Sequence, residues 1–264
     1  MKTLQILLLV TICHPAFASV KVKNKLILET KTVKRVEASQ AKKFFLKEYK
    51  KTLSRPQLIV LKKKTLEMGS KAVPALIEVM KNSNYPDKNK WMATFMLGKI
   101  MGKKSAAFIS KFLRHPSWVM RMASLKTLLA LRQTKYKSLY VDALKDKSFI
   151  VRNQALENIR TLKLSELAPH VWAMLYDKRN YYNPKTGNRK RTNIIRKVIK
   201  AVGDLKFKKA GSPMIKMIQK KKYIDIFKEL DYSLTKITGK KSPAGSALLK
   251  RNYWKRIGMG ITTI

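Results

Sequence analysis

The chain has 264 residues, of which 45% are hydrophobic, so it is long enough for one substantial core or one continuous repeat array. Lysine and arginine total 59 against 15 aspartate and glutamate residues, which gives a formal net charge of +44. Such an excess repels itself. It indicates either a polyanionic partner or a lysine-rich composition that only solvates the surface.

Residues 1–18 have the pattern of a secretion signal. Residues 4–12 are almost all apolar, and the last three, Ala-Phe-Ala, offer small side chains at both positions that signal peptidase reads. We expect cleavage between Ala18 and Ser19, and therefore a periplasmic or secreted protein. Cys13, the only cysteine, would leave with the signal, so the mature chain would have no disulfide, thiolate nucleophile or cysteine metal site. A buried N-terminal helix and a lipoprotein signal are the alternatives.

Residues 19–54 are predicted to form a basic N-terminal arm and one helix. Lysines alternate with apolar residues over 20–26, which is typical of a short extended arm or of a disordered segment. A lysine-rich amphipathic helix is expected over 37–53. Pro56 separates it from a further helix expected over 57–68.

A period of about 31 residues runs through the rest of the chain. Aligned 12-residue segments end at Ile100, Leu131, Leu162, Leu205 and Ile237, which are 31, 31, 43 and 32 residues apart. Each places apolar residues three and four apart, as in the buried stripe of a helix. A second set of amphipathic helices is predicted between them, over 72–81, 105–114, 136–145, 167–176 and 211–220. One helix pair cannot bury both of its apolar faces, so we expect the pairs to stack into one array.

These segments resemble the HEAT family. The stretch Ala-Val-Pro-Ala-Leu-Ile-Glu-Val-Met at 72–80 matches its first helix, and Val-Arg at 151–152 with apolar residues at 156, 159 and 162 matches its second. Over residues 55–240 the units are similar to the short bacterial HEAT units related to those of phycobilisome lyases. The resemblance implies an all-α fold, a right-handed α-solenoid of about five to six stacked helix pairs. It does not specify a function, because HEAT arrays serve many roles.

Lys90, Arg121 and Arg152 occupy one equivalent position near the start of three successive second helices. One interpretation is a ladder of cations that binds a partner along one surface. The other is that each cation reaches an acidic turn residue or the carbonyl groups of the adjacent unit. Asp87 and Asp146 lie at turns where they would serve as such partners.

The spacing of 43 residues predicts an insertion, which we place at 178–191. It holds six cations and no acid, with two adjacent tyrosines. Insertions in solenoids often lie on the binding face, and cations with aromatic residues suit phosphate and stacking contacts. The candidate partner-binding residues of this segment are Tyr181, Tyr182, Lys185, Arg189, Lys190 and Arg191. A solvated loop without a function is the alternative.

Trp118 is the tryptophan whose position best suits an exposed contact, because it follows the expected N-cap Ser117 at a helix start. Trp91 and Trp172 are expected in packing between helices.

Residues 241–264 are predicted to form a capping helix and tail, with Trp254 covering the last apolar face of the array. A basic amphipathic helix over 248–257, lying on an anionic membrane surface, is the alternative.

No pattern indicates catalysis, a cofactor or a metal ion. The two histidines that follow the signal, His115 and His170, are far apart in the repeat array. Glu166 lies one turn before His170, where a local hydrogen bond is expected rather than half of a metal site. No glycine-rich phosphate-binding loop is present.

The sequence therefore predicts an exported, non-enzymatic, basic scaffold or adaptor. The predicted partner is an acidic protein or a polyanion such as an envelope polymer, anionic lipid or nucleic acid. The alternative is a nucleic-acid-binding HEAT protein, including a HEAT-like alkylpurine DNA glycosylase, for which the chain has the charge and the tryptophans but no catalytic aspartate that aligns.

Overall fold

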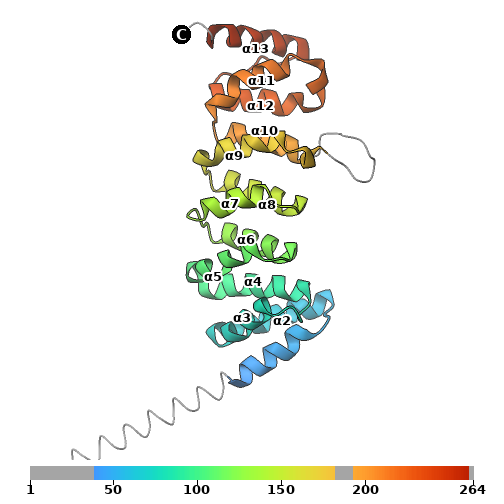
Figure 1. Cartoon of the computed structure of the whole chain (residues 1–264), viewed down its shortest axis with the longest axis vertical. Helices are drawn as coiled ribbons and strands as arrows, with labels where there is room; N and C mark the ends of the chain where they lie inside the picture. Colours follow the sequence, from blue (N-terminus) through green and yellow to red (C-terminus); the bar gives the residue numbers. More distant parts are fainter. Residues whose placement is uncertain (1–38, 182–192, 262–264) are drawn as a thin grey trace, which may run out of the picture.

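The structure is a computed structural model that describes residues 39–181 and 193–261. The expected signal, the arm, most of the insertion and the last three residues lie outside these ranges. Within them every regular element is a helix, and the helices follow one another along one axis in chain order (Figure 1). The predicted all-α solenoid is therefore confirmed. Over the same residues, no helix is long and apolar enough to cross a membrane.

The N-terminal end of the array consists of a helix over 39–50 and α2 (Arg55–Met68). Ser54 starts α2 with a capping box, because its hydroxyl accepts from the Gln57 amide while the Gln57 side chain accepts from the Ser54 amide. Asn89 ties this end to the first repeat, since its side-chain amide donates to the carbonyl oxygens of Tyr49 at 2.6 Å and of Lys51 at 2.8 Å.

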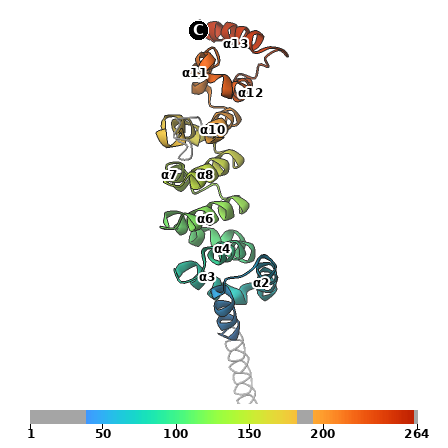
Figure 2. The same cartoon turned by 90° about the vertical axis from the view of Figure 1, so that its right-hand side faces the viewer.

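Five helix pairs follow in the described part of the chain. Their first helices are α3 (Val73–Lys81), α5 (Ala106–Lys111), α7 (Lys137–Leu144), α9 (Ala168–Ala173) and α11 (Gly211–Ile218). Their second helices are α4 (Asp87–Met101), α6 (Trp118–Ala130), α8 (Phe149–Thr161), α10 (Asn193–Asp204) and α12 (Phe227–Thr238). Figure 2 shows α7 and α11 on one side of the stack and α8 and α12 on the other, so first and second helices form separate layers. The predicted bounds of the second helices agree with these to within two residues.

Two glycines allow neighbouring second helices to approach closely. A Cβ atom on Gly98 of α4 would lie 2.4 Å from the Thr127 side chain of α6. A Cβ atom on Gly203 of α10 would lie 2.7 Å from the Cα atom of Ser233 on α12, and the Ser233 hydroxyl donates to the Ile199 carbonyl at 2.8 Å. These contacts explain why glycine occupies the same repeat position in α4 and α10.

Three second helices end on a cationic residue in the left-handed backbone region. Arg132, Lys163 and Lys206 follow α6, α8 and α10 with φ values of 49°, 54° and 52°. In each case the next amide donates to a carbonyl five residues earlier, as in a Schellman motif. The same turn is therefore repeated without the glycine that usually occupies this position.

The C-terminal helix α13 (Ala247–Ile261) packs against α11 and closes the array. Trp254 of α13 is fully buried, and its indole Nε1 donates to Asp231 of α12 at 2.7 Å. Asp231 also accepts from the Ser242 hydroxyl and from Lys250, each at 2.7 Å. Burial acts to raise the pKa of Asp231, but these hydrogen bonds lower it by a larger amount, so the pKa lies below its ordinary value. Trp254 is therefore packed into the C-terminal end of the array and does not face solvent.

Candidate binding face

The proposed cation ladder is buried inside the array. Lys90, Arg121 and Arg152 are 6%, 6% and 2% exposed, so they do not present their charges to a partner. Lys90 pairs with Asp87 at 2.8 Å in the first turn of α4. The structure corrects the partner-binding interpretation of these three residues and supports the alternative, in which they hold the turns between helices.

Arg121 has the most complete set of partners. Its Nε and Nη2 atoms donate to the two carboxylate oxygens of Asp146 at 2.6 and 2.8 Å, a bidentate pair across adjacent repeats. Its Nη1 atom donates to the carbonyl oxygens of His115 and Pro116, each at 2.8 Å. Asp146 also accepts from the Ser148 amide at 2.7 Å. Burial acts to raise the pKa of Asp146, but Arg121 and the Ser148 amide hold it below its ordinary value.

Arg152 repeats this arrangement one unit further on with an amide in place of the acid. Its Nε atom donates to the Asn180 side-chain oxygen at 3.0 Å, and its Nη1 atom donates to the Asp146 carbonyl at 2.8 Å. Asn180 is fully buried and donates to the Met174 carbonyl. Asn180 was placed in the insertion from the sequence, whereas the structure places it in the packing of the array.

Tyr181, the next residue of the segment assigned to the insertion, also bonds to a backbone carbonyl of the array. Tyr181 is half-buried, and its hydroxyl donates to the Leu175 carbonyl at 2.7 Å. The other candidates in this segment, Tyr182, Lys185, Arg189, Lys190 and Arg191, lie outside the described residues. Positions 178–181, which the sequence assigned to the insertion, therefore belong to the packed array.

Trp118 is 44% exposed at the first turn of α6, as its position indicated. Ser117 occupies the N-cap position, but its side chain makes no capping hydrogen bond. Instead its backbone amide donates to the imidazole Nδ1 of His115 at 3.0 Å.

The solvent-facing side of the second helices forms a continuous surface, which we call the second-helix face. One residue from each helix, at one repeat position, forms its centre, and we call this row the central ladder. Its members, in chain order, are Phe95, Lys126, Glu157, Lys200 and Tyr232. Lys200 is exposed and the other four are half-buried. Because their helices pack in sequence along the stack, the row crosses all five repeats.

Aromatic rings and lysines meet at both ends of the central ladder. At the N-terminal end, Trp91 stacks on Phe95 with ring centroids 6.1 Å apart, and the Lys126 ammonium lies 5.4 Å from the Trp91 centroid. At the C-terminal end, the ammonium groups of Lys200 and Lys236 lie 5.1 and 5.6 Å from the Tyr232 centroid. Both arrangements are within cation–π distance, so the rings help to fix the lysines on this face.

An ion-pair network joins α8, α10 and α12 beside the ladder. Arg160 donates to Asp204 at 2.6 Å, and the Tyr232 hydroxyl donates to the other oxygen of Asp204 at 2.5 Å. This hydrogen bond, together with burial, raises the pKa of Tyr232. Lys197 of α10 donates to Asn153 of α8 at 2.9 Å. The network fixes the register between neighbouring second helices and thereby the spacing of the ladder.

Sequence reasoning missed the central ladder because it followed conspicuous residue types. The aligned segments contained the signal. The same column holds Phe, Lys, Glu, Lys and Tyr, none of which is aliphatic, and the columns on either side of it are almost entirely buried. A column of that kind in an amphipathic helix marks the side that faces solvent.

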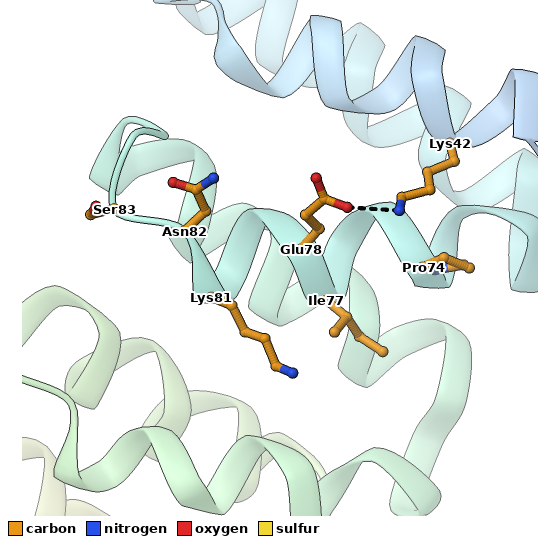
Figure 3. Close-up of a pocket in the computed structure, with 7 residues that line it drawn as sticks. All are labelled: Lys42, Pro74, Ile77, Glu78, Lys81, Asn82 and Ser83. Carbon is orange, nitrogen blue, oxygen red and sulfur yellow. Dashed lines mark ion pairs between the residues drawn. The ribbon is translucent and has the colours of Figure 1, made fainter.

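A shallow hollow lies between the helix over 39–50 and α3, on the opposite layer (Figure 3). Its volume is about 690 Å³, and Lys42 pairs with Glu78 across it at 2.8 Å. Ile77 and Lys81 line the side formed by α3. Since the only acid and one of the two cations in its lining neutralise each other, the hollow has no set of groups for catalysis.

The described residues contain no group of three histidine, cysteine or acidic side chains that could hold a metal ion. Glu166 pairs with Lys137 at 2.6 Å, and His170 is exposed. The expected hydrogen bond between Glu166 and His170 is therefore wrong, because a lysine from α7 takes the carboxylate instead.

Comparison with known proteins identifies part of the array. Residues 73–160 match the family model described as HEAT repeats, which covers the pairs from α3 to α8. No curated protein matches the chain.

Proposed function

We propose that this HEAT-repeat helical scaffold is exported and that its second-helix face binds an acidic protein or a polyanionic component of the cell envelope. The observation that carries the proposal is the central ladder, which crosses five repeats and holds Lys126 and Lys200 beside aromatic rings at its two ends. Cations and aromatic groups together suit carboxylate or phosphate contacts combined with apolar ones.

The distribution of acids supports the same proposal. Several acids are bound by cations or donors of the array itself, among them Asp87, Asp146, Asp177, Asp204 and Asp231. These acids are thus already engaged within the array, and the large excess of lysine and arginine behind the net charge of +44 has no acid of the chain to pair with. A surface of this kind attracts acidic partners and speeds their association.

Export is supported by the sequence of residues 1–18 alone, which has the charge, the apolar run and the small residues of a secretion signal. An exported scaffold meets acidic polymers and proteins of the envelope, so the two halves of the proposal are consistent. N-terminal sequencing of the protein from its native host tests it, with Ser19 as the expected first residue. An intact Met1 on soluble cytosolic protein would contradict export.

The binding face is tested by reversing charge on one layer at a time. Lys126→Glu with Lys200→Glu changes the second-helix face, and Lys111→Glu with Lys216→Glu makes the same charge change at exposed positions of α5 and α11. Both variants and the wild type serve as baits in a pull-down from envelope extract, after circular dichroism has verified that they are folded. We expect the first variant to lose partners that the second retains.

Salt dependence provides a second readout. Binding to a polyanion weakens steeply with salt because the neutralised groups release counterions, so the wild type should show the steeper slope and the Lys126→Glu, Lys200→Glu variant the shallower one. Equal recovery and equal slopes for the two double variants would show that total charge, and not the second-helix face, determines binding.

A further inference from the structure

The central ladder is not uniformly basic. Glu157 occupies its middle position, with Lys126 one repeat before it and Lys200 one repeat after it. The Glu157 side chain is 43% exposed, and its carboxylate lies 3.5 Å from Arg160 Nη1 and accepts from the Thr161 hydroxyl at 3.0 Å. Arg160 directs its shorter hydrogen bond to Asp204, at 2.6 Å. The carboxylate of Glu157 therefore remains on the surface that a partner would cover.

A negative charge in this position acts against one class of partner. A uniform polyanion that lies along the row places anionic groups opposite Lys126, Glu157 and Lys200 alike, so the attraction at the two lysines is offset by repulsion at the middle position. A polypeptide of mixed charge avoids this conflict, because it can place a cation or a hydrogen-bond donor opposite Glu157. Juxtaposed like charges are a common source of specificity at interfaces.

We infer, on the basis of the proposed function, that the second-helix face selects a protein segment of mixed charge. In that segment, two acidic residues face Lys126 and Lys200, and a basic residue between them faces Glu157. The aromatic rings at the two ends of the ladder provide contact area for apolar side chains flanking the acids.

The helix spacing sets the period of the segment. Packed helices lie about 8–10 Å apart, so Lys126 and Lys200, two repeats apart, are separated by roughly 20 Å. An extended chain advances about 3.3 Å per residue, which places the two acids about six residues apart. Because side chains two residues apart share one face of an extended chain, the basic residue lies about two residues after the first acid. Nucleic acid, an acidic polysaccharide and an anionic lipid surface carry no cation at that position, and they are the alternatives that the test separates.

The test compares two variants that make the same charge change on different layers. Glu157→Lys alters the middle of the central ladder, and Asp142→Lys alters an exposed acid of α7. Each variant and the wild type are titrated with three probes: heparin, a peptide with two glutamates about six residues apart and a lysine about two residues after the first, and the same peptide with glutamate in place of that lysine. Fluorescence anisotropy at low ionic strength gives the dissociation constants.

We expect Glu157→Lys to bind heparin and the all-acidic peptide about three- to tenfold more tightly than Asp142→Lys does, because only the first substitution reverses a charge on the surface that these probes cover. The mixed peptide should bind the wild type more tightly than the all-acidic peptide does, and Glu157→Lys should reverse this order. If Glu157→Lys and Asp142→Lys behave alike with all three probes, the inference is wrong.

Failure of the underlying function gives a different result. If Lys126→Glu with Lys200→Glu leaves the affinity for every probe unchanged, the second-helix face is not the binding surface and the inference fails with it. If that double variant loses affinity but Glu157→Lys does not discriminate among the probes, the face binds acidic partners without the selection inferred here.

Discussion

Asp146→Ala tests whether the array depends on the paired turns between its repeats. The substitution removes the two carboxylate oxygens that accept from Arg121, one of which also accepts from the Ser148 amide. The side chains of Arg121 and Asp146 are only 7% and 11% exposed, so the arginine would be left in a poorly solvated site. Removing one member of a buried ion pair typically costs about 3–5 kcal/mol. Arg121 retains the carbonyl oxygens of His115 and Pro116, which places the expected loss at about 3 kcal/mol, the lower end of that range.

Urea unfolding followed by circular dichroism measures this loss. Asp142→Ala is the matched control, because it removes the same charge from an exposed position four residues earlier, and it should change the free energy of unfolding by less than about 0.5 kcal/mol. Asp146→Asn should fall between the two, since an amide oxygen still accepts from the Ser148 amide or from one arginine N–H. If Asp146→Ala is no less stable than Asp142→Ala, the ion pair does not stabilise the array.

Three further predictions concern a close helix contact, a buried carboxylate and the insertion. Gly203→Ala should destabilise the array by about 1–3 kcal/mol through overpacking against Ser233, and should lower its melting temperature accordingly. Gly211→Ala is the control: its new Cβ atom would meet only an ordinary 3.7 Å contact, so the melting temperature should change much less. The stability that Asp231 provides is present above its ordinary pKa of 3.8 and is lost as the pH falls through its lower folded-state pKa. Acid unfolding, followed by tryptophan fluorescence, should therefore set in below about pH 4, and its midpoint should shift in Asp231→Asn. Replacing residues 182–188 by a short glycine linker should cost little stability, because loop length is thermodynamically cheap, and should reduce partner recovery in a pull-down if the insertion takes part in binding. Equal recovery would show that the insertion does not contribute.

The sequence predicted the helix pairs well because their signal is local and repeated. Apolar residues three and four apart located all five second helices, and the position of Trp254 identified the capping helix. The signal weakened where a residue's role depends on a neighbouring repeat. Asn180 seemed part of an insertion, yet Arg152 holds it in the core at a sequence separation of 28 residues. Glu166 has a histidine one turn away and binds a lysine of α7 instead. The direction that a polar side chain faces is decided by such contacts between repeats, which no single helix specifies.

The cationic residues in left-handed turns make this array easier to stabilise than a comparable one closed by glycines. A non-glycine residue in that region costs roughly 1–2 kcal/mol, and glycine removes this cost while adding back up to about 1 kcal/mol of backbone entropy in the unfolded chain. Arg132, Lys163 and Lys206 are exposed at equivalent positions at the ends of α6, α8 and α10, away from the central ladder. Arg132→Gly, Lys163→Gly and Lys206→Gly are thus three independent substitutions that should each raise the melting temperature and leave the residues of the central ladder unchanged.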